Sequence, residues 1–133
     1  MTVGLATTLR NARADQIKTA IDAGGAAGFL RIYDGSRPAT GGTATTLLAE
    51  LTLSFPSAAA ASGGVLTFSA ITADSSANAT GTATWGRMVT SAGVFVDDFS
   101  VGTSGQDLNL NSTSITILQQ VSVTSGTLTE GNA

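Results

Sequence analysis

The sequence predicts an all-β protein, an antiparallel β-sandwich or barrel, with one helix at its N-terminal end. Three observations predict this fold. Beyond residue 28, apolar and polar side chains alternate along short runs, which is the pattern of a half-buried strand. Gly, Pro, Asn and Asp separate these runs at short, regular intervals. The chain has 133 residues, a length that suits a single domain.

Residues 5–22, LATTLRNARADQIKTAID, contain no Gly or Pro and have the composition of a helix. Gly24 and Gly25 predict where this helix ends. On a helical wheel, one side of the segment is apolar and the opposite side is polar. The apolar side holds Leu5, Ala6, Leu9, Ala12, Ile17, Ala20 and Ile21, and the polar side holds Thr7, Asn11, Asp15, Lys18 and Asp22. Arg10 and Arg13 interrupt the apolar side.

Two arrangements of this helix are open: it packs on its own sheet, or it is an arm that docks on a neighbouring subunit. Arg10 and Arg13 favour the arm, because it costs free energy to bury charged side chains in the core of the same chain. We therefore predict a helical arm at residues 1–25 and a β-sandwich domain at residues 26–133. The candidate interface residues are Leu5, Leu9, Arg10, Arg13 and Ile17, with the two arginines as anchors to acidic groups. Removal of residues 1–23 is expected to leave a folded domain that no longer binds its partner.

The first predicted strands lie before residue 72. In FLRIYD, residues 29–34, Leu30 and Ile32 share one face of a strand. The run LLAELTLSF, residues 47–55, places its apolar side chains on one side, namely Leu47, Ala49, Leu51 and Leu53. A small-residue linker follows, and VLTFSAI, residues 65–71, is the next strand.

The clearest hairpin joins TATWGRMVTS, residues 82–91, to VFVDDFSVG, residues 94–102, through a short turn that contains Gly93. Asp97 and Asp98 are adjacent in the second strand. Neighbours in a strand point to opposite faces, so these two acids do not form a catalytic pair. We expect one of them to pair with Arg87 across the hairpin.

Asp107, Asn109 and Asn111 follow one another at the spacing of the first ligands of a calcium loop. Such a loop needs Gly at its sixth position and Glu at its twelfth, and Ser112 and Leu118 stand there instead. The simpler interpretation is a strand whose inward residues are those between the polar ones, Leu108 and Leu110. The last predicted strand lies within ILQQVSVTSGTLT, residues 117–129.

The composition excludes several functions. The chain has no Cys and no His, so it has no disulfide, no thiol or zinc chemistry and no histidine base, and we expect neither an enzyme nor a cofactor. A net charge of −3 with scattered basic residues argues against nucleic acid as a partner. No stretch has the length of a transmembrane helix, so no membrane partner is expected. The core is rich in Ala and therefore modest, which favours a homo-dimer, a homo-trimer or a larger assembly.

Several segments resemble a known family. They are IDAGGAAG, LRIYDGSRPA, LLAELTLS, ITADSSANATGTATWGRMV and SVGTSGQDLNLNSTSITILQQVSVTSGTLTEGN. Together they resemble the small structural proteins encoded in the head-gene regions of tailed bacteriophages and prophages. The resemblance implies a jelly-roll-like β-sandwich that acts as a capsid cement or decoration protein. Such a protein binds the major capsid protein on the capsid exterior of the virion and bridges capsomers, with no catalytic residue.

Two other functions remain open at this point. One is a tail- or fibre-associated virion module, which differs from a cement protein in its copy number and position. The other is a carbohydrate- or receptor-binding β-sandwich, in which Trp85 and Tyr33 form a stacking platform. That last function requires Trp85 to be exposed.

Overall fold

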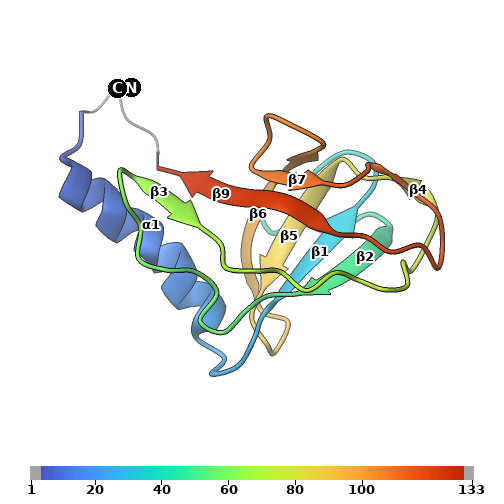
Figure 1. The fold of residues 1–133 in the computed structure, drawn as a ribbon, viewed down its shortest axis with the longest axis horizontal. Helices are drawn as coiled ribbons and strands as arrows, with labels where there is room; N and C mark the ends of the chain where they lie inside the picture. Colours follow the sequence, from blue (N-terminus) through green and yellow to red (C-terminus); the bar gives the residue numbers. More distant parts are fainter. Residues whose placement is uncertain (1–3, 131–133) are drawn as a thin grey trace.

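The computed structural model describes residues 4–130, which form one helix and nine short strands (Figure 1). The helix α1 spans Thr7–Asp22. The strands are β1 (Phe29–Tyr33), β2 (Leu47–Thr52), β3 (Val65–Thr67), β4 (Gly81–Thr82), β5 (Trp85–Val89), β6 (Phe95–Gly102), β7 (Leu108–Leu110), β8 (Ser114–Ile115) and β9 (Val123–Thr129). The predicted β-rich fold with an N-terminal helix is confirmed. Residues 1–3 and 131–133, at the outer ends of the predicted arm and β-domain, lie outside the described residues.

Seven of the strands form one curled sheet in the order β2-β1-β5-β6-β7-β9-β3, which has the shape of a half-barrel (Figure 1). β4 and β8 form a separate antiparallel pair on the side of the molecule away from α1. The sheet is mixed, because β6 and β7 run parallel while its other pairs are antiparallel. The prediction of a purely antiparallel sheet is therefore wrong.

A compact loop explains how two consecutive strands run parallel with so short a connection. The backbone N–H and the hydroxyl of Ser100 in β6 both donate to the Asp107 carboxylate, at 3.3 and 3.0 Å. Gly105 in this loop has a φ of +70°, which L-residues rarely adopt. These features turn the chain back so that Leu108 lies beside Val101.

The predicted alternation is confirmed in most strands. Leu30 and Ile32 of β1 are fully buried, as are Leu108 and Leu110 of β7. β2 departs from the pattern, because Leu48 is buried and Leu47 is only half-buried. The reason is a shift of register between β1 and β2, where Ile32 faces Ala49 and the next pair is Tyr33 with Leu47.

The long connection between β1 and β2, residues 34–46, folds back over the outer face of the sheet. The indole N–H of Trp85 donates to the carbonyl oxygen of Asp34 and to the hydroxyl of Thr45, at 3.0 and 3.1 Å. Further along the loop, Arg87 donates to the carbonyl oxygen of Gly42 at 3.0 Å. Both faces of β5 are therefore covered by protein, and Met88 on its inner face is also fully buried.

The two edge strands of the curled sheet are covered by other parts of the chain. Thr72 bridges to Thr52 beside β2, and the backbone N–H of Asn78 donates to the carbonyl oxygen of Leu48 at 2.7 Å. On the other edge, Ala58 bridges to Phe68 just beyond β3. Covered edges do not offer a free row of backbone groups to another strand. Contacts with other molecules therefore depend on side chains and loops.

Candidate interaction surfaces

Helix α1 is packed against the chain's own β-structure. Ala14 and Ile21 are buried in the core, and Ile17 packs against it from the side. Leu9 is 48% exposed, and Ala12 and Ala20 are also exposed. The side of the helix that faces the core is therefore rotated from the predicted apolar side. The helix therefore packs on its own sheet, which is one of the two arrangements that the sequence left open.

The two arginines expected to anchor a neighbour have partners in their own chain. Arg10 donates from Nε and Nη2 to the carbonyl oxygen of Glu130, at 3.2 and 2.9 Å. Arg13 forms an ion pair with the Glu130 carboxylate, 2.7 Å from Nη2 to Oε1. The physical reason is that the end of β9 lies beside the first turns of α1, which the sequence spacing does not reveal. In the described chain both arginines are thus paired within the molecule, and their role as anchors to a neighbour stays a prediction.

The polar side of the helix binds backbone, where the sequence predicted contact with solvent. Asn11 accepts a hydrogen bond from the backbone N–H of Gly64, and Asp15 accepts one from that of Ala61, both at 2.7 Å. Asp22 accepts from the N–H of Ser57 through both carboxylate oxygens, at 3.1 and 3.2 Å. The helix thus supplies acceptors to a linker that runs past it outside any regular strand.

Of the five candidate interface residues, Leu9 and Arg13 remain substantially exposed, with the Arg13 side chain at 55%. Leu5, Arg10 and Ile17 are half-buried. These five residues do not form a continuous apolar patch. Removal of residues 1–23 would take Ala14 and Ile21 out of the core, so we now expect the truncation to lower the stability of the remaining chain.

The aromatic platform is buried. Trp85 is 1% exposed and stacks on Tyr33, with ring centroids 4.5 Å apart and planes 17° apart. The Arg87 guanidinium lies 5.3 Å from the centre of the Trp85 ring and 5.0 Å from that of Phe95. Stacking of a sugar requires an open aromatic face, and the 34–46 loop covers this one. The carbohydrate-binding interpretation therefore loses its main support.

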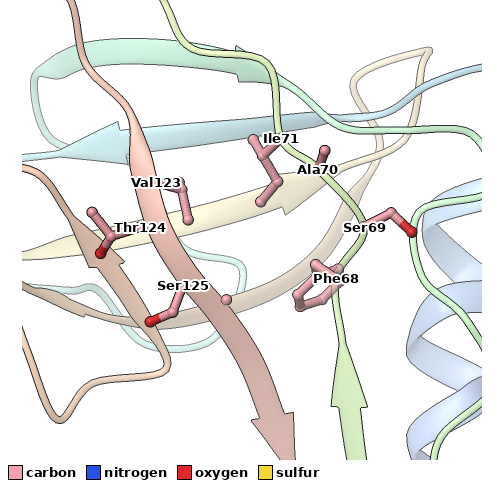
Figure 2. Close-up of a pocket in the computed structure, with 8 residues that line it drawn as sticks. Phe68, Ser69, Ala70, Ile71, Val123, Thr124 and Ser125 are labelled. Carbon is pink, nitrogen blue, oxygen red and sulfur yellow. The ribbon is translucent and has the colours of Figure 1, made fainter.

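A small pocket of about 110 Å³ opens where the pairing of β3 with β9 ends (Figure 2). It is lined by Phe68, Ser69, Ala70, Ile71, Val123, Thr124, Ser125 and Gly126. Figure 2 shows Phe68, Ile71 and Val123 directed toward the opening between the two segments, and the Ser69 hydroxyl directed away from it. The hydroxyls of Thr124 and Ser125 are bonded to Asn109. A pocket of this size is well below the usual range for small-molecule sites, and no charged residue lines it.

One exposed apolar surface lies at the end of the molecule where α1 terminates. Three loops meet there, residues 23–28, 54–58 and 90–94, and none of their residues is charged. We call this surface the uncharged end. Its two large apolar side chains are Phe55 and Val94, which are 52% and 60% exposed.

A second exposed apolar surface is the turn between β8 and β9. Ile117 and Leu118 are 52% and 72% exposed. Leu118 has a φ of +70°, and it is the one non-glycine residue within the described range with positive φ. Backbone hydrogen bonds hold the turn: the N–H of Leu118 donates to the carbonyl oxygen of Ala77, and that of Ile117 to the Thr80 hydroxyl, both at 2.9 Å. An exposed leucine in a strained conformation is a candidate contact residue.

The acidic residues form no metal-binding group: within residues 4–130, no three metal-ligating side chains gather in one place. In the same part of the chain, no helix is long and apolar enough to cross a membrane.

One acid is unusual, because Asp97 on the inner face of β6 has a buried Oδ1 with no hydrogen-bond partner among the described residues. Comparison with protein-family models, curated proteins and solved structures gave no match. Functional inference therefore depends on the residues and surfaces described above.

Proposed function

We propose that the protein is a structural cement or decoration protein of a tailed-phage head. In this proposal it binds the major capsid protein on the outside of the shell, bridges neighbouring capsomers, and has a β-sandwich of jelly-roll type. The observation that carries the proposal is the presence of two separate exposed apolar surfaces on one compact body. These are the uncharged end, where α1 terminates, and the Ile117–Leu118 turn, between β8 and β9.

A bridging protein needs at least two contact surfaces whose relative positions are fixed. Here the turn that carries Leu118 is bonded to residues 77 and 80, and the loops of the uncharged end are bonded to α1 and to β-structure. Because the edge strands are covered, the body is protected against uncontrolled strand pairing at high local density. Fixed contact surfaces and covered edge strands both suit a protein that is present in many neighbouring copies on a shell.

The surface chemistry also supports this proposal. Charged residues make up 11% of the chain, far below the roughly 25% of an average domain. Few charges need to lose water when such a surface meets another protein. Each contact is small, but a protein held at two points gains from effective concentration, so two weak contacts give firm attachment.

Copy number tests the proposal. The chain would be quantified by mass spectrometry in purified particles, relative to the major capsid subunit. A ratio near one, or a simple fraction of one, is expected for a protein spread over the shell. A ratio many times smaller would instead favour a tail- or fibre-associated module, and absence from particles would exclude both.

The contact surface is tested in the same particles. Leu118→Asp is expected to reduce the amount of bound protein, because a carboxylate at a desolvated contact must lose its water. The matched control is Thr43→Asp, at an exposed position in the 34–46 loop that belongs to neither apolar surface. Equal binding of the two variants would exclude the Ile117–Leu118 turn as the shell contact.

A further inference from the structure

The uncharged end is a surface of mostly small residues with two large apolar side chains. Its exposed small residues are Ala23, Gly24, Gly25, Ala26, Ala92 and Gly93. Phe55 and Val94 are the exposed large apolar residues of two of the three loops. Small residues allow another backbone to come close, and a large side chain from a facing surface has room to lie against them.

The three loops hold one another in place. A Cβ atom on Gly24 would overlap the Ser91 side chain, so the end of α1 and the β5–β6 turn are in direct contact. The backbone N–H of Leu53 donates to the carbonyl oxygen of Gly28 at 3.0 Å, and Ser57 is bonded to Asp22. These contacts fix the loops in a defined surface before any partner binds, which lowers the entropy lost on association.

Val94 is presented by a tight turn. The backbone N–H of Thr90 donates to the carbonyl oxygen of Val94 at 2.9 Å, and the Thr90 hydroxyl accepts from the N–H of Val94 at 3.2 Å. Neither bond involves the valine side chain. That side chain is therefore free to contact another molecule and can be replaced without loss of the turn.

Charged groups lie only at the rim of this surface, and they are paired. Asp22 accepts from Ser57 as described above. Arg31 passes near Gly93, and its Nε donates to the Glu50 carboxylate at 2.7 Å. An apolar centre with a satisfied polar rim is the usual anatomy of a protein–protein interface.

We propose that the uncharged end is a self-association surface, through which two copies of the chain meet about a twofold axis. In such an interface the same patch of both copies is in contact. A charged residue in the patch would therefore lie near the same, like-charged residue of the other copy. The uncharged end has no charge to repel, whereas the whole chain carries a net charge of −3. A loop surface of small residues and two large ones is also self-complementary, because Phe55 of each copy can lie on the Ala and Gly residues of the other.

The other apolar surface does not suit this role. The Ile117–Leu118 turn is a single tight turn, and two such turns would meet only at their tips. We assign that turn to the shell and the uncharged end to a second copy. This assignment rests on the proposed function and changes how the bridge is made: each copy binds the shell through its own turn, and two copies joined at their uncharged ends link two shell sites. It is tested on the purified protein alone, so its failure and the failure of the cement function are separately visible.

The experiment is sedimentation velocity of the full chain over a wide range of concentrations. The wild type is expected to show a monomer–dimer equilibrium. Val94→Asp and Phe55→Asp should each raise the dissociation constant at least about a hundredfold, because each buries an unpaired carboxylate at the interface. Leu118→Asp, a matched change at the other apolar surface, should leave the dissociation constant unchanged. Far-UV circular dichroism and the fluorescence of the buried Trp85 show that each variant is folded.

Three results would overturn the proposal. The first is a wild-type protein that stays monomeric at every concentration reached. The second is a dimer that both Val94→Asp and Phe55→Asp leave intact while they remain folded. The third is a dimer that Leu118→Asp weakens as much as Val94→Asp does, since self-association would then use the turn.

Discussion

Arg87 and Asp98 face each other across the β5–β6 hairpin and share two hydrogen bonds, Nε to Oδ1 at 2.6 Å and Nη2 to Oδ2 at 3.0 Å. Their side chains are only 12% and 5% exposed. The hydrogen bond to Asp98 raises the pKa of Arg87 above its ordinary value, although burial of the guanidinium acts in the opposite direction. The pair closes the outer face of the sheet beneath the 34–46 loop, where Asp98 also accepts from the N–H of Gly41.

Asp98→Ala is predicted to destabilise the protein by about 3–5 kcal/mol, because it leaves a buried guanidinium without its counter-charge. The matched control is Glu50→Ala, which removes the same kind of partner from Arg31. That pair is 31% and 37% exposed, so its loss should change the free energy of unfolding by less than about 1 kcal/mol. Urea denaturation of both variants measures the difference. If the two variants lose the same free energy of unfolding, burial of the Arg87–Asp98 pair does not determine how much the pair contributes to stability.

Asp97, the neighbour of Asp98, points to the opposite face and has no such partner. Burial, with the nearby charges of Asp98 and Asp107, raises the pKa of Asp97 to about 7. An unfolded aspartate has a pKa of about 3.9. Between these two values the folded protein holds one proton more than the unfolded chain at this site. Stability due to Asp97 is therefore greatest below about pH 4, falls as pH rises to about 7, and is constant above that.

Asp97→Asn is predicted to remove this loss of stability, because the amide stays neutral at every pH. At pH 8 the variant should be more stable than the wild type by up to about 4 kcal/mol, since one pKa unit corresponds to about 1.4 kcal/mol. At pH 4 the two proteins should have similar stability. Urea midpoints measured from pH 4 to pH 8 test this. Curves that run parallel over the whole range would show that Asp97 is charged in the folded protein throughout.

Trp85 is the single tryptophan of the chain, so its fluorescence reports on one site. Because the ring is 1% exposed between Tyr33 and Arg87, acrylamide should quench it several-fold less in the folded protein than in urea. Trp85→Phe should also destabilise the protein by about 1–3 kcal/mol, because Asp34 and Thr45 lose a buried donor. Efficient quenching in the folded state would mean that the 34–46 loop opens, and would restore the sugar-stacking interpretation.

Local patterns were sufficient to predict several of these features. The period-two alternation identified Leu30, Ile32, Leu108 and Leu110 as inward residues, and all four are buried. The hairpin was predictable because its two strands are adjacent in sequence, and its turn contains Gly93 in a conformation with positive φ. That one of Asp97 and Asp98 pairs with Arg87 also followed from the hairpin, whereas the choice of Asp98 depends on the register of the two strands.

Features that depend on distant segments could not be predicted in this way. Asn11, Asp15 and Asp22 have the spacing of a solvent-facing helix side, and their true partners are backbone groups more than thirty residues away. Arg10 and Arg13 contact Glu130, near the opposite end of the chain. The composition of the uncharged end was visible in the sequence, but the meeting of its three loops was not.

The packed position of α1 gives a prediction that replaces the arm hypothesis. Ile21→Ala should destabilise the protein by about 2–5 kcal/mol, because it opens a cavity beside the core. Leu9→Ala, on the exposed side of the same helix, should change stability by less than about 0.5 kcal/mol. Thermal unfolding of the two variants tests this. A small effect of Ile21→Ala would mean that the helix leaves the body in solution, as an arm does.

Leu118 connects stability with the proposed function. A leucine with a φ of +70° costs about 1–2 kcal/mol relative to an ordinary conformation. Glycine at this position avoids that strain but loses about 0.5–1 kcal/mol through the greater freedom of the unfolded chain. Leu118→Gly should therefore raise the free energy of unfolding by up to about 1.5 kcal/mol, while it lowers binding to particles because the exposed side chain is lost.

Ile117→Gly is the control for this prediction, since Ile117 is also exposed but lacks the positive φ. It should lower particle binding as well, but it should decrease stability. Opposite signs for stability and binding in Leu118→Gly would mean that the strain at Leu118 is retained because its side chain contacts the shell. If Leu118→Gly is more stable and binds particles as well as the wild type, the strained leucine has no role in attachment, and the shell contact lies elsewhere on the molecule.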